Sequence, residues 1–324
     1  MIVIRMAIII VCIMGCSIQP KEISSNSELF KIGIAIYNLE DSYMAEMAAD
    51  LEEKLIKAFE NTDTELRYEI LDAKGSEAKQ SRQMDYLFKQ NMDILLLNLV
   101  DPASAANVLE QANNQKIAVI LFNREPNIED MDVGNKLWYV GSDGQLAGRL
   151  QGEMLMDAWN REQSRIDQNE NGKIDYILVE GEPAHYDTVR RTNAFIASTE
   201  DTLPMNLLAN FSADWNRAQA YEAMKLLSGE VVCEIEAAIC NNDDMALGIY
   251  DFYKKEEYEI PLLIGINDDK EVHELVNQGI FYGTVQLNQK NQVNDIIDII
   301  EKLHMGETVE QKYWYSVPEI HSRF

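Results

Sequence analysis

Short apolar runs alternate with longer amphipathic stretches along most of the chain. Eight of the runs have the length of strands, at residues 32–37, 94–98, 117–122, 138–140, 176–179, 237–239, 262–266 and 283–285. They are nearly all apolar rather than alternating, which is typical of parallel strands that helices cover on both faces. The pattern therefore predicts strands buried within a layered α/β structure.

The segments between these runs have the period of helices. In the clearest one, the apolar face consists of Met44, Met47, Leu51, Leu55 and Phe59, and we interpret this stripe as core. Asp41 or Ser42 is its expected N-cap. Repeated β–α order over this length predicts an α/β fold with two doubly wound, Rossmann-like lobes.

Polar side chains follow many of the predicted strands. In doubly wound sheets, ligands bind beyond the carboxyl ends of the strands. The candidate residues there are Asp41, Tyr43, Asn98, His185, Asp187, Arg191, Asn241, Asn242, Asp243, Asn267 and Asn288. Amides mixed with carboxylates suit hydroxyl groups, which both donate and accept hydrogen bonds. Asp268 and Asp269 are expected to cap the following helix.

Residues 167–175 read Asp-Gln-Asn-Glu-Asn-Gly-Lys-Ile-Asp, which is the spacing of a calcium loop with Gly172 at the sharp turn. The predicted ligands are Asp167, Asn169, Asn171, Asp175 and the backbone carbonyl of Lys173. The twelfth position, where an EF-hand has Glu, is Leu178. A further carboxylate must then come from elsewhere in the fold. The alternative is a solvated acidic turn.

The N-terminus has the features of a signal peptide. Arg5 precedes an apolar run at 7–14 that is too short to span a bilayer as a stable helix. The run leads into Ile13-Met-Gly-Cys16, which resembles the bacterial lipobox and implies lipidation of Cys16. We expect a lipoprotein signal peptide at 1–15, a flexible tether at 16–29 and anchoring to the outer face of the cell membrane, periplasmic where an outer membrane exists. The alternatives are an uncleaved anchor and an ordinary secretion signal.

Composition narrows the classes of partner. The 28 Lys and Arg against 55 Asp and Glu give a net charge of −27, which repels nucleic acid. The 324 residues, 46% of them hydrophobic, are enough for two domains.

Cys240 ends an apolar run and is expected to be buried, although a disulfide with Cys233 is an alternative. No Cys/His spacing indicates zinc.

Several motifs together resemble the galactose/glucose-binding proteins, the substrate-binding components of sugar ABC transporters in the type I periplasmic-binding-protein superfamily. They are Ile36-Tyr-Asn-Leu-Glu-Asp-Ser-Tyr-Met, Asn98-Leu-Val-Asp-Pro, Phe122-Asn-Arg-Glu-Pro, Gly181-Glu-Pro-Ala-His-Tyr-Asp with Arg191, and Asn241-Asn-Asp. The resemblance covers almost the whole chain after the N-terminal segment. It implies the fold of that superfamily, with a hinge between the lobes.

The resemblance also assigns roles to residues. The implied sugar contacts are Asp41, Asn98, His185, Asp187, Arg191 and Asn242, with an aromatic sandwich of Tyr43 and Trp215. Glu236 is the implied remote calcium ligand. Two positions depart from the family: Asn267 replaces an Asp, and Leu287 replaces an Asn, with Asn288 adjacent. Each change removes a polar contact to a ring hydroxyl or alters its charge.

The implied function is capture of a monosaccharide, a galactose- or glucose-like hexose, by a monomer that delivers it to an ABC permease and carries structural Ca²⁺. We expect one lobe at 30–141 plus 287–312 and the other at 142–286 plus 313–324. One alternative is a sensing module that presents ligand occupancy to a chemoreceptor or sensor kinase. Another is an enzyme that uses His185, Asp187 and Asp41 as acid and base.

Overall fold

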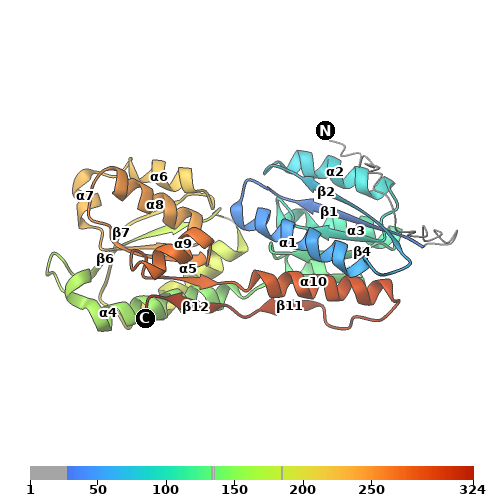
Figure 1. Ribbon diagram of the computed structural model, residues 1–324. Coiled ribbons are helices and arrows are strands. Elements are labelled where there is room, and N and C mark those ends of the chain that lie inside the picture. The colour runs from blue at the N-terminus through green and yellow to red at the C-terminus, as the bar shows by residue number, and fades with distance from the viewer. Residues whose placement is uncertain (1–27, 133, 135, 184) are drawn as a thin grey trace, which may run out of the picture.

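The computed structural model describes residues 28–132, 134, 136–183 and 185–324. Within these residues the chain forms two lobes that lie end to end, each built on a six-stranded sheet (Figure 1). Both lobes are α/β layers with helices on both faces, so the predicted fold class is confirmed.

The first lobe has the strand order β11-β5-β4-β3-β1-β2, and all neighbouring strands are parallel. Its strands are β1 (Leu29–Ile36), β2 (Glu65–Asp72), β3 (Ile94–Leu97), β4 (Ala118–Phe122), β5 (Leu137–Ser142) and β11 (Tyr313–Ser316). Its helices are α1 (Ser42–Phe59), α2 (Glu77–Lys89), α3 (Ala105–Gln115) and α10 (Gln289–His304), with short 3₁₀ turns η1 (Pro102–Ser104) and η2 (Ile128–Asp132). Helices α1 and α10 share one core with the sheet, while α2 and α3 contribute to another.

The second lobe has the order β12-β10-β9-β8-β6-β7, with only the edge strand β12 antiparallel to its neighbour among the described pairs. Its strands are β6 (Ile174–Glu180), β7 (Met205–Ser212), β8 (Ala237–Cys240), β9 (Leu262–Asn267), β10 (Gly283–Gln286) and β12 (Glu319–Ser322). Its helices are α4 (Gly144–Ile166), α5 (Tyr186–Thr199), α6 (Arg217–Met224), α7 (Gly229–Glu234), α8 (Asp243–Lys255) and α9 (Lys270–Asn277). Helices α4 and α5 pack together on one face, and α6, α7, α8 and α9 contribute to the core on the other.

All eight predicted strands are present, and helix α1 begins where the pattern indicates. Its cap is Asp41, whose Oδ1 accepts a hydrogen bond from the Met44 N–H at 3.1 Å. The sequence analysis missed β2, β7, β11 and β12, which are the four edge strands of the two sheets. Edge strands keep partly exposed, polar positions, so they lack the continuous apolar run that reveals central strands.

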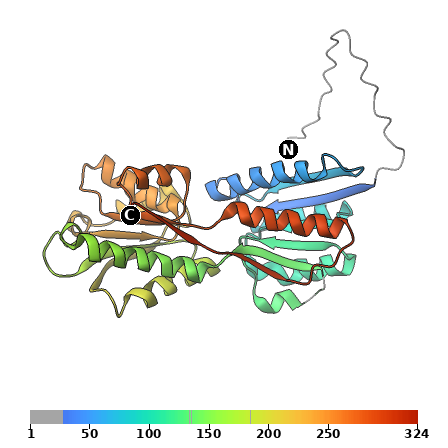
Figure 2. The same cartoon turned by 60° about the horizontal axis from the view of Figure 1, so that its bottom comes forward.

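The chain passes between the lobes three times within the described residues, from β5 to α4, from β10 to α10 and from β11 to β12. Figure 2 shows these connections at the waist of the molecule. The expected assignment of 313–324 to the second lobe needs correction, because β11 pairs with β5 in the first sheet and only β12 joins the second. Hydropathy does not distinguish the two sheets for a four-residue edge strand.

Two smaller predictions concern cysteine and the membrane. Cys240 is buried as expected, and Cys233 and Cys240 are free thiols, so the disulfide alternative is wrong. Among the described residues, no helix has both the length and the apolar character needed to cross a membrane. The signal peptide at 1–15, Cys16 and nearly all of the tether at 16–29 lie outside the described residues.

Candidate ligand-binding cleft

A pocket lies between the two lobes, at the carboxyl ends of their strands. Its lining residues are Tyr37, Asp41, Tyr43, Asn123, Arg124, His185, Asp187, Arg191, Trp215, Asn242, Asn267 and Leu287. The empty volume, which includes space open to solvent, is about 370 Å³. Of the eight residues that the resemblance assigns to the sugar, all but Asn98 line this pocket, and Asn267 lines it as well. The other strand-end candidates, Asn241, Asp243 and Asn288, are not among its lining residues.

The first lobe contributes an acidic group at the start of α1. Asp41 Oδ2 accepts a hydrogen bond from the Tyr37 hydroxyl, and burial raises the pKa of the Asp41 carboxyl. The Arg124 guanidinium lies over the Tyr37 ring, 3.7 Å from its centroid. The same guanidinium reaches the second lobe, where Nη2 donates to Glu182 Oε1 at 2.7 Å. One side of the pocket is therefore a connected polar group that links the lobes.

The second lobe contributes His185 at the N-terminus of α5. Its Nδ1 accepts the Asp187 N–H at 3.1 Å, so the proton of the neutral ring is on Nε2. Burial, followed by the charges of Arg124 and Arg191, lowers the pKa of His185 well below its usual 6.5. His185 is therefore neutral near pH 7 and has one N–H available as a donor.

Arg191, six residues further along in α5, is anchored by two hydrogen bonds. Its Nη1 donates to the Asn241 carbonyl at 2.8 Å, and its Nη2 donates to Asp187 Oδ2 at 3.0 Å. Its Nε is buried and has no acceptor among the residues that the structure describes. Arg191 therefore lines the pocket and keeps one buried N–H that no described side chain or backbone oxygen accepts.

Two aromatic rings enter the pocket from opposite lobes. Tyr43 is on α1, and its hydroxyl accepts from Gln292 Nε2 at 3.1 Å. Trp215 lies between β7 and α6 with a left-handed backbone (φ 62°), and its carbonyl accepts from Asn242 Nδ2 at 3.2 Å. A Cβ at Gly181 would lie 2.1 Å from Trp215 Cζ2, so only glycine admits the indole here. Contacts within its own lobe therefore hold each of these two residues in place.

Asn98 requires a correction. It is fully buried and does not line the pocket. Its Oδ1 accepts the Tyr37 N–H at 3.1 Å, while its Nδ2 donates to the Phe122 carbonyl and to Asn123 Oδ1 at 3.2 and 3.1 Å. Because β1, β3 and β4 are adjacent, the short amide is used to join the strand ends and supports Tyr37 and Asn123 from behind.

Three lining residues were not assigned a role from the sequence: Tyr37, Asn123 and Arg124. Tyr37 follows β1 directly, and the other two follow β4. The rule that ligands bind beyond strand ends would have found them if it had been applied to every strand. Of the two positions that depart from the family, Asn267 has a strained backbone with φ 134°, and Leu287 is buried in the pocket wall.

The predicted calcium loop connects α4 to β6. Glu236, immediately before β8, reaches this loop: Oε1 accepts the Gln168 N–H at 2.8 Å, and Oε2 accepts the Asp175 N–H at 2.9 Å. Asn169 and Asn171 each donate Nδ2 to Asp175 Oδ2 at 2.7 Å. The fold thus brings a distant carboxylate beside the loop.

The donor set of this loop fits a hard cation in type. Asp167, Asp175 and Glu236 supply carboxylates. The Asn169 and Asn171 amides now turn their nitrogens toward Asp175, and a half-turn of each amide would place its oxygen there, where a cation could bind it. Gly172 adopts φ 76° at the turn, which suits glycine. The loop backbone and side chains now satisfy one another, and Ca²⁺ would replace these hydrogen bonds with coordination.

The chain forms two α/β lobes with mainly parallel sheets, and three connections join the lobes beside a shared pocket. This arrangement is that of the type I periplasmic class of binding proteins. The chain belongs to the family described as "Periplasmic binding protein domain", which matches residues 32–308.

Two curated relatives align with most of this chain. The D-galactose/methyl-galactoside binding periplasmic protein MglB of Haemophilus influenzae is 28% identical over 285 residues, covering 87% of this chain and 83% of that protein. The ribose import binding protein RbsB of Bacillus subtilis is 24% identical over 263 residues, covering 79% and 77%.

Solved structures share the fold. An ABC transporter solute binding protein from Bacillus halodurans with bound myo-inositol has a TM-score of 0.77 at 22% identity, covering 93% of this chain and 96% of that one. A periplasmic solute binding protein from Actinobacillus succinogenes with bound D-allose has a TM-score of 0.75 at 17% identity, covering 91% and 98%.

Proposed function

We propose that this protein captures a monosaccharide, a galactose- or glucose-like hexose, between its lobes outside the cytoplasm and delivers it to an ABC permease. One observation carries the proposal. The interlobe pocket presents two aromatic rings, Tyr43 and Trp215, one from each lobe, together with buried carboxylate, guanidinium, imidazole and amide groups. We infer that the enzyme alternative does not apply and that bound sugar leaves unchanged.

The chemistry of these groups matches a sugar ring. Asp41 and Asp187 accept hydrogen bonds, whereas Arg191 Nε and His185 Nε2 donate them. Hydroxyl groups do both, and bonds to charged partners are the strong ones. The C–H faces of a pyranose pack on the flat rings of Tyr43 and Trp215.

The relatives guide the choice of sugar. MglB of Haemophilus influenzae is named for D-galactose and methyl-galactoside, and RbsB of Bacillus subtilis for ribose. We favour a hexose because the motifs around Asp41, His185 and Asn242 resemble the galactose/glucose-binding proteins. Asn267 and Leu287 are the positions at which we expect specificity to depart from them.

Isothermal titration of residues 17–324, in calcium, tests the binding. The panel is galactose, glucose, allose, ribose and myo-inositol. We expect one-to-one binding of a hexose, its loss in Trp215→Ala, and unchanged binding in the matched control Trp314→Phe, which alters β11 away from the pocket. No binding across the panel and a wider set of monosaccharides would overturn the proposal.

Transport is tested separately. Uptake of the labelled sugar should fall in cells that lack this gene and return with the wild-type gene but not with the Trp215→Ala form. Normal uptake without the protein, together with a lost chemotactic or transcriptional response to the sugar, would instead support the sensing alternative.

We also propose that the loop at 167–175, with Glu236, holds one structural Ca²⁺ that does not contact the sugar. Cys16 is the proposed lipid attachment site. Mass spectrometry of the mature N-terminus from the native host would show a diacylglycerol-modified cysteine, and an unmodified cleaved N-terminus would contradict this.

A further inference from the structure

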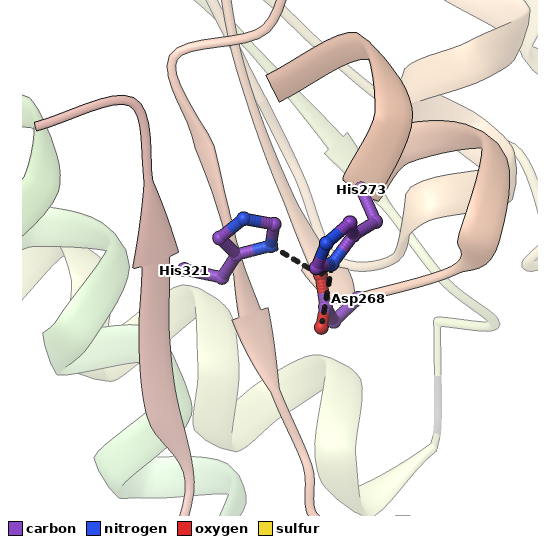
Figure 3. A group of neighbouring side chains, drawn as sticks. All are labelled: Asp268, His273 and His321. Atoms are coloured by element: carbon purple, nitrogen blue, oxygen red, sulfur yellow. Dashed lines mark hydrogen bonds and ion pairs between the residues drawn. The ribbon is translucent and has the colours of Figure 1, made fainter. Parts of the chain in front are cut away.

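A cluster of two histidines and one aspartate lies outside the cleft, in the second lobe (Figure 3). Asp268 follows β9, His273 is in α9, and His321 is in the C-terminal strand β12. One potential ligand atom from each of the three residues lies within 4.8 Å of the others. We propose that this cluster is a binding site for a divalent transition metal, with Zn²⁺ as the best match.

Both imidazoles face the same carboxylate. His321 Nδ1 lies 2.5 Å from Asp268 Oδ1, and His273 Nδ1 lies 3.1 Å from the same oxygen. The ring centroids of His273 and His321 are only 4.0 Å apart, an arrangement in which two imidazolium charges would repel each other. A metal ion between the three ligand atoms neutralises the carboxylate and uses the imidazoles in their neutral form.

The distances suit a tetrahedral ion. Ligand atoms around tetrahedral Zn²⁺ lie ~3.3–3.5 Å apart, given bond lengths of about 2.0–2.2 Å. The two nitrogen–oxygen distances of the cluster, 2.5 and 3.1 Å, would have to lengthen by at most about 1 Å to reach these values, and all three ligand atoms lie within 4.8 Å of one another. Three protein ligands leave one position for water, and His273, the most exposed of the three with 47% of its side chain accessible, leaves the cluster open to solvent.

The scaffold around the cluster is firm. His321 is opposite Thr284 in the β10–β12 pairing. The hydroxyl of that same Thr284 accepts the Asp268 N–H at 3.2 Å and donates to Asp243 at 2.8 Å. Asp268 and His321 are therefore both fixed to Thr284 in β10 of the second sheet, as expected for a preorganised metal site.

The ligand types select the metal. Imidazole nitrogens suit Zn²⁺, Cu²⁺ and Ni²⁺, whereas Ca²⁺ prefers a shell made of oxygen. This cluster is therefore distinct from the all-oxygen loop that ends at Asp175. The net charge of −27 concentrates cations near the surface in general. A bound metal would link β12 through His321 to α9 through His273 and to the end of β9 through Asp268. Strand β12 is the one that follows the third interlobe connection.

The test is Zn²⁺ binding to residues 17–324, measured by competition with a chromophoric indicator, without sugar and with Ca²⁺ present to occupy the loop. We expect one Zn²⁺ per chain and weakening by more than about tenfold in His273→Gln and in Asp268→Asn. His304→Gln in α10 is the matched control and should bind like the wild type. Co²⁺ in place of Zn²⁺ should give the visible absorption of a tetrahedral site with nitrogen ligands.

Absence of one-to-one Zn²⁺ binding would show that the cluster is only a hydrogen-bonded group, and this result would overturn the proposal. Wild-type affinity in both His273→Gln and Asp268→Asn would place the metal elsewhere and overturn it equally. Because no sugar is used, neither result depends on the proposed transport function.

Discussion

The Arg191 side chain has one buried N–H without a hydrogen-bond acceptor among the described residues. Two of its nitrogens are anchored to Asn241 and Asp187, and the third, Nε, faces no acceptor among the described residues. A buried donor without a partner costs free energy. Because Arg191 lines the pocket, we expect a sugar hydroxyl to accept from Nε and remove that cost.

Arg191→Lys should therefore weaken sugar binding strongly while leaving the fold intact. A lost charge-assisted hydrogen bond is worth about 1.5–3 kcal/mol, or roughly one to two decades in affinity. Isothermal titration against the best-binding sugar measures the change. Arg161→Lys, which alters an exposed pair on α4, is the control. Equal affinity in both variants would show that Nε does not contact the ligand.

His185 leads to a prediction about pH. Burial and two neighbouring guanidinium groups depress its pKa, so the folded protein holds it neutral while the unfolded chain protonates it below about pH 6.5. The unfolded state then binds more protons, and the free energy of unfolding falls as the pH drops below ~6.5, by at most ~1.4 kcal/mol per pH unit.

Replacement by asparagine should remove this part of the acid sensitivity. Asn retains an acceptor for the Asp187 N–H that His185 Nδ1 now caps. Urea unfolding at pH 7.5, 6.5 and 5.5 measures the slope for wild type and His185→Asn. The prediction concerns the difference between the two slopes, and parallel curves would contradict it.

At the level of single residues, the sequence predicted most of the pocket because strand ends and family motifs identify the same side chains. It failed at Asn98, whose role depends on neighbouring strand ends that only the folded sheet brings together. It also failed at Asp268, which was expected to cap a helix but pairs with His273 and His321. His273 and His321 are too far apart in the chain for their spacing to indicate a metal site.

Among the elements, the loop between α4 and β6 is held in part by a residue far from it in the sequence. Glu236 immediately precedes β8, the strand next to β6, and its carboxylate accepts hydrogen bonds from the loop backbone at Gln168 and Asp175. The loop is therefore tied to the second sheet, and a cation bound there would stabilise the lobe as a whole. The spacing of oxygen side chains predicted the loop, whereas Glu236 was found only through the resemblance, because a lone carboxylate has no local pattern.

Removal of Ca²⁺ should lower the melting temperature. Ligand at 100 times its dissociation constant adds about 2.7 kcal/mol, which corresponds to roughly 5–10 °C for a lobe of this size. Differential scanning calorimetry in Ca²⁺ and in chelator measures the shift. Glu236→Gln should abolish the difference, while Glu234→Gln, an exposed neighbour at the end of α7, should retain it. An unchanged melting temperature of the wild type in chelator would disprove calcium binding.

On the scale of the whole molecule, polar contacts hold the lobes together across the cleft. Arg124 bonds Glu182 through both Nη atoms at 3.1 and 2.7 Å. Arg190 Nη1 donates to Glu125 at 2.8 Å, and the Ser42 hydroxyl donates to Asp244 at 2.7 Å. These contacts characterise a closed arrangement, and opening about the three connections would expose each group to water.

The pair of Arg124 and Glu182 should set the balance between open and closed forms. The Arg124 side chain is only 2% exposed, whereas Glu182 is 38% exposed. Closure therefore buries the guanidinium and requires a charged acceptor, because an unpaired buried charge is costly. Glu182 itself does not line the pocket, so its effect on affinity would act through closure.

Glu182→Gln should shift the sugar-free protein toward the open form and weaken sugar binding several-fold to about tenfold, since apparent affinity scales with the closed fraction. Small-angle scattering with and without sugar measures the open fraction, and titration measures affinity. Glu222→Gln removes an exposed ion pair within α6 and its C-cap, and it should change neither quantity. Weaker binding with an unchanged radius of gyration would show that Glu182 acts on the pocket directly, and no change in either would show that the lobes close without this pair.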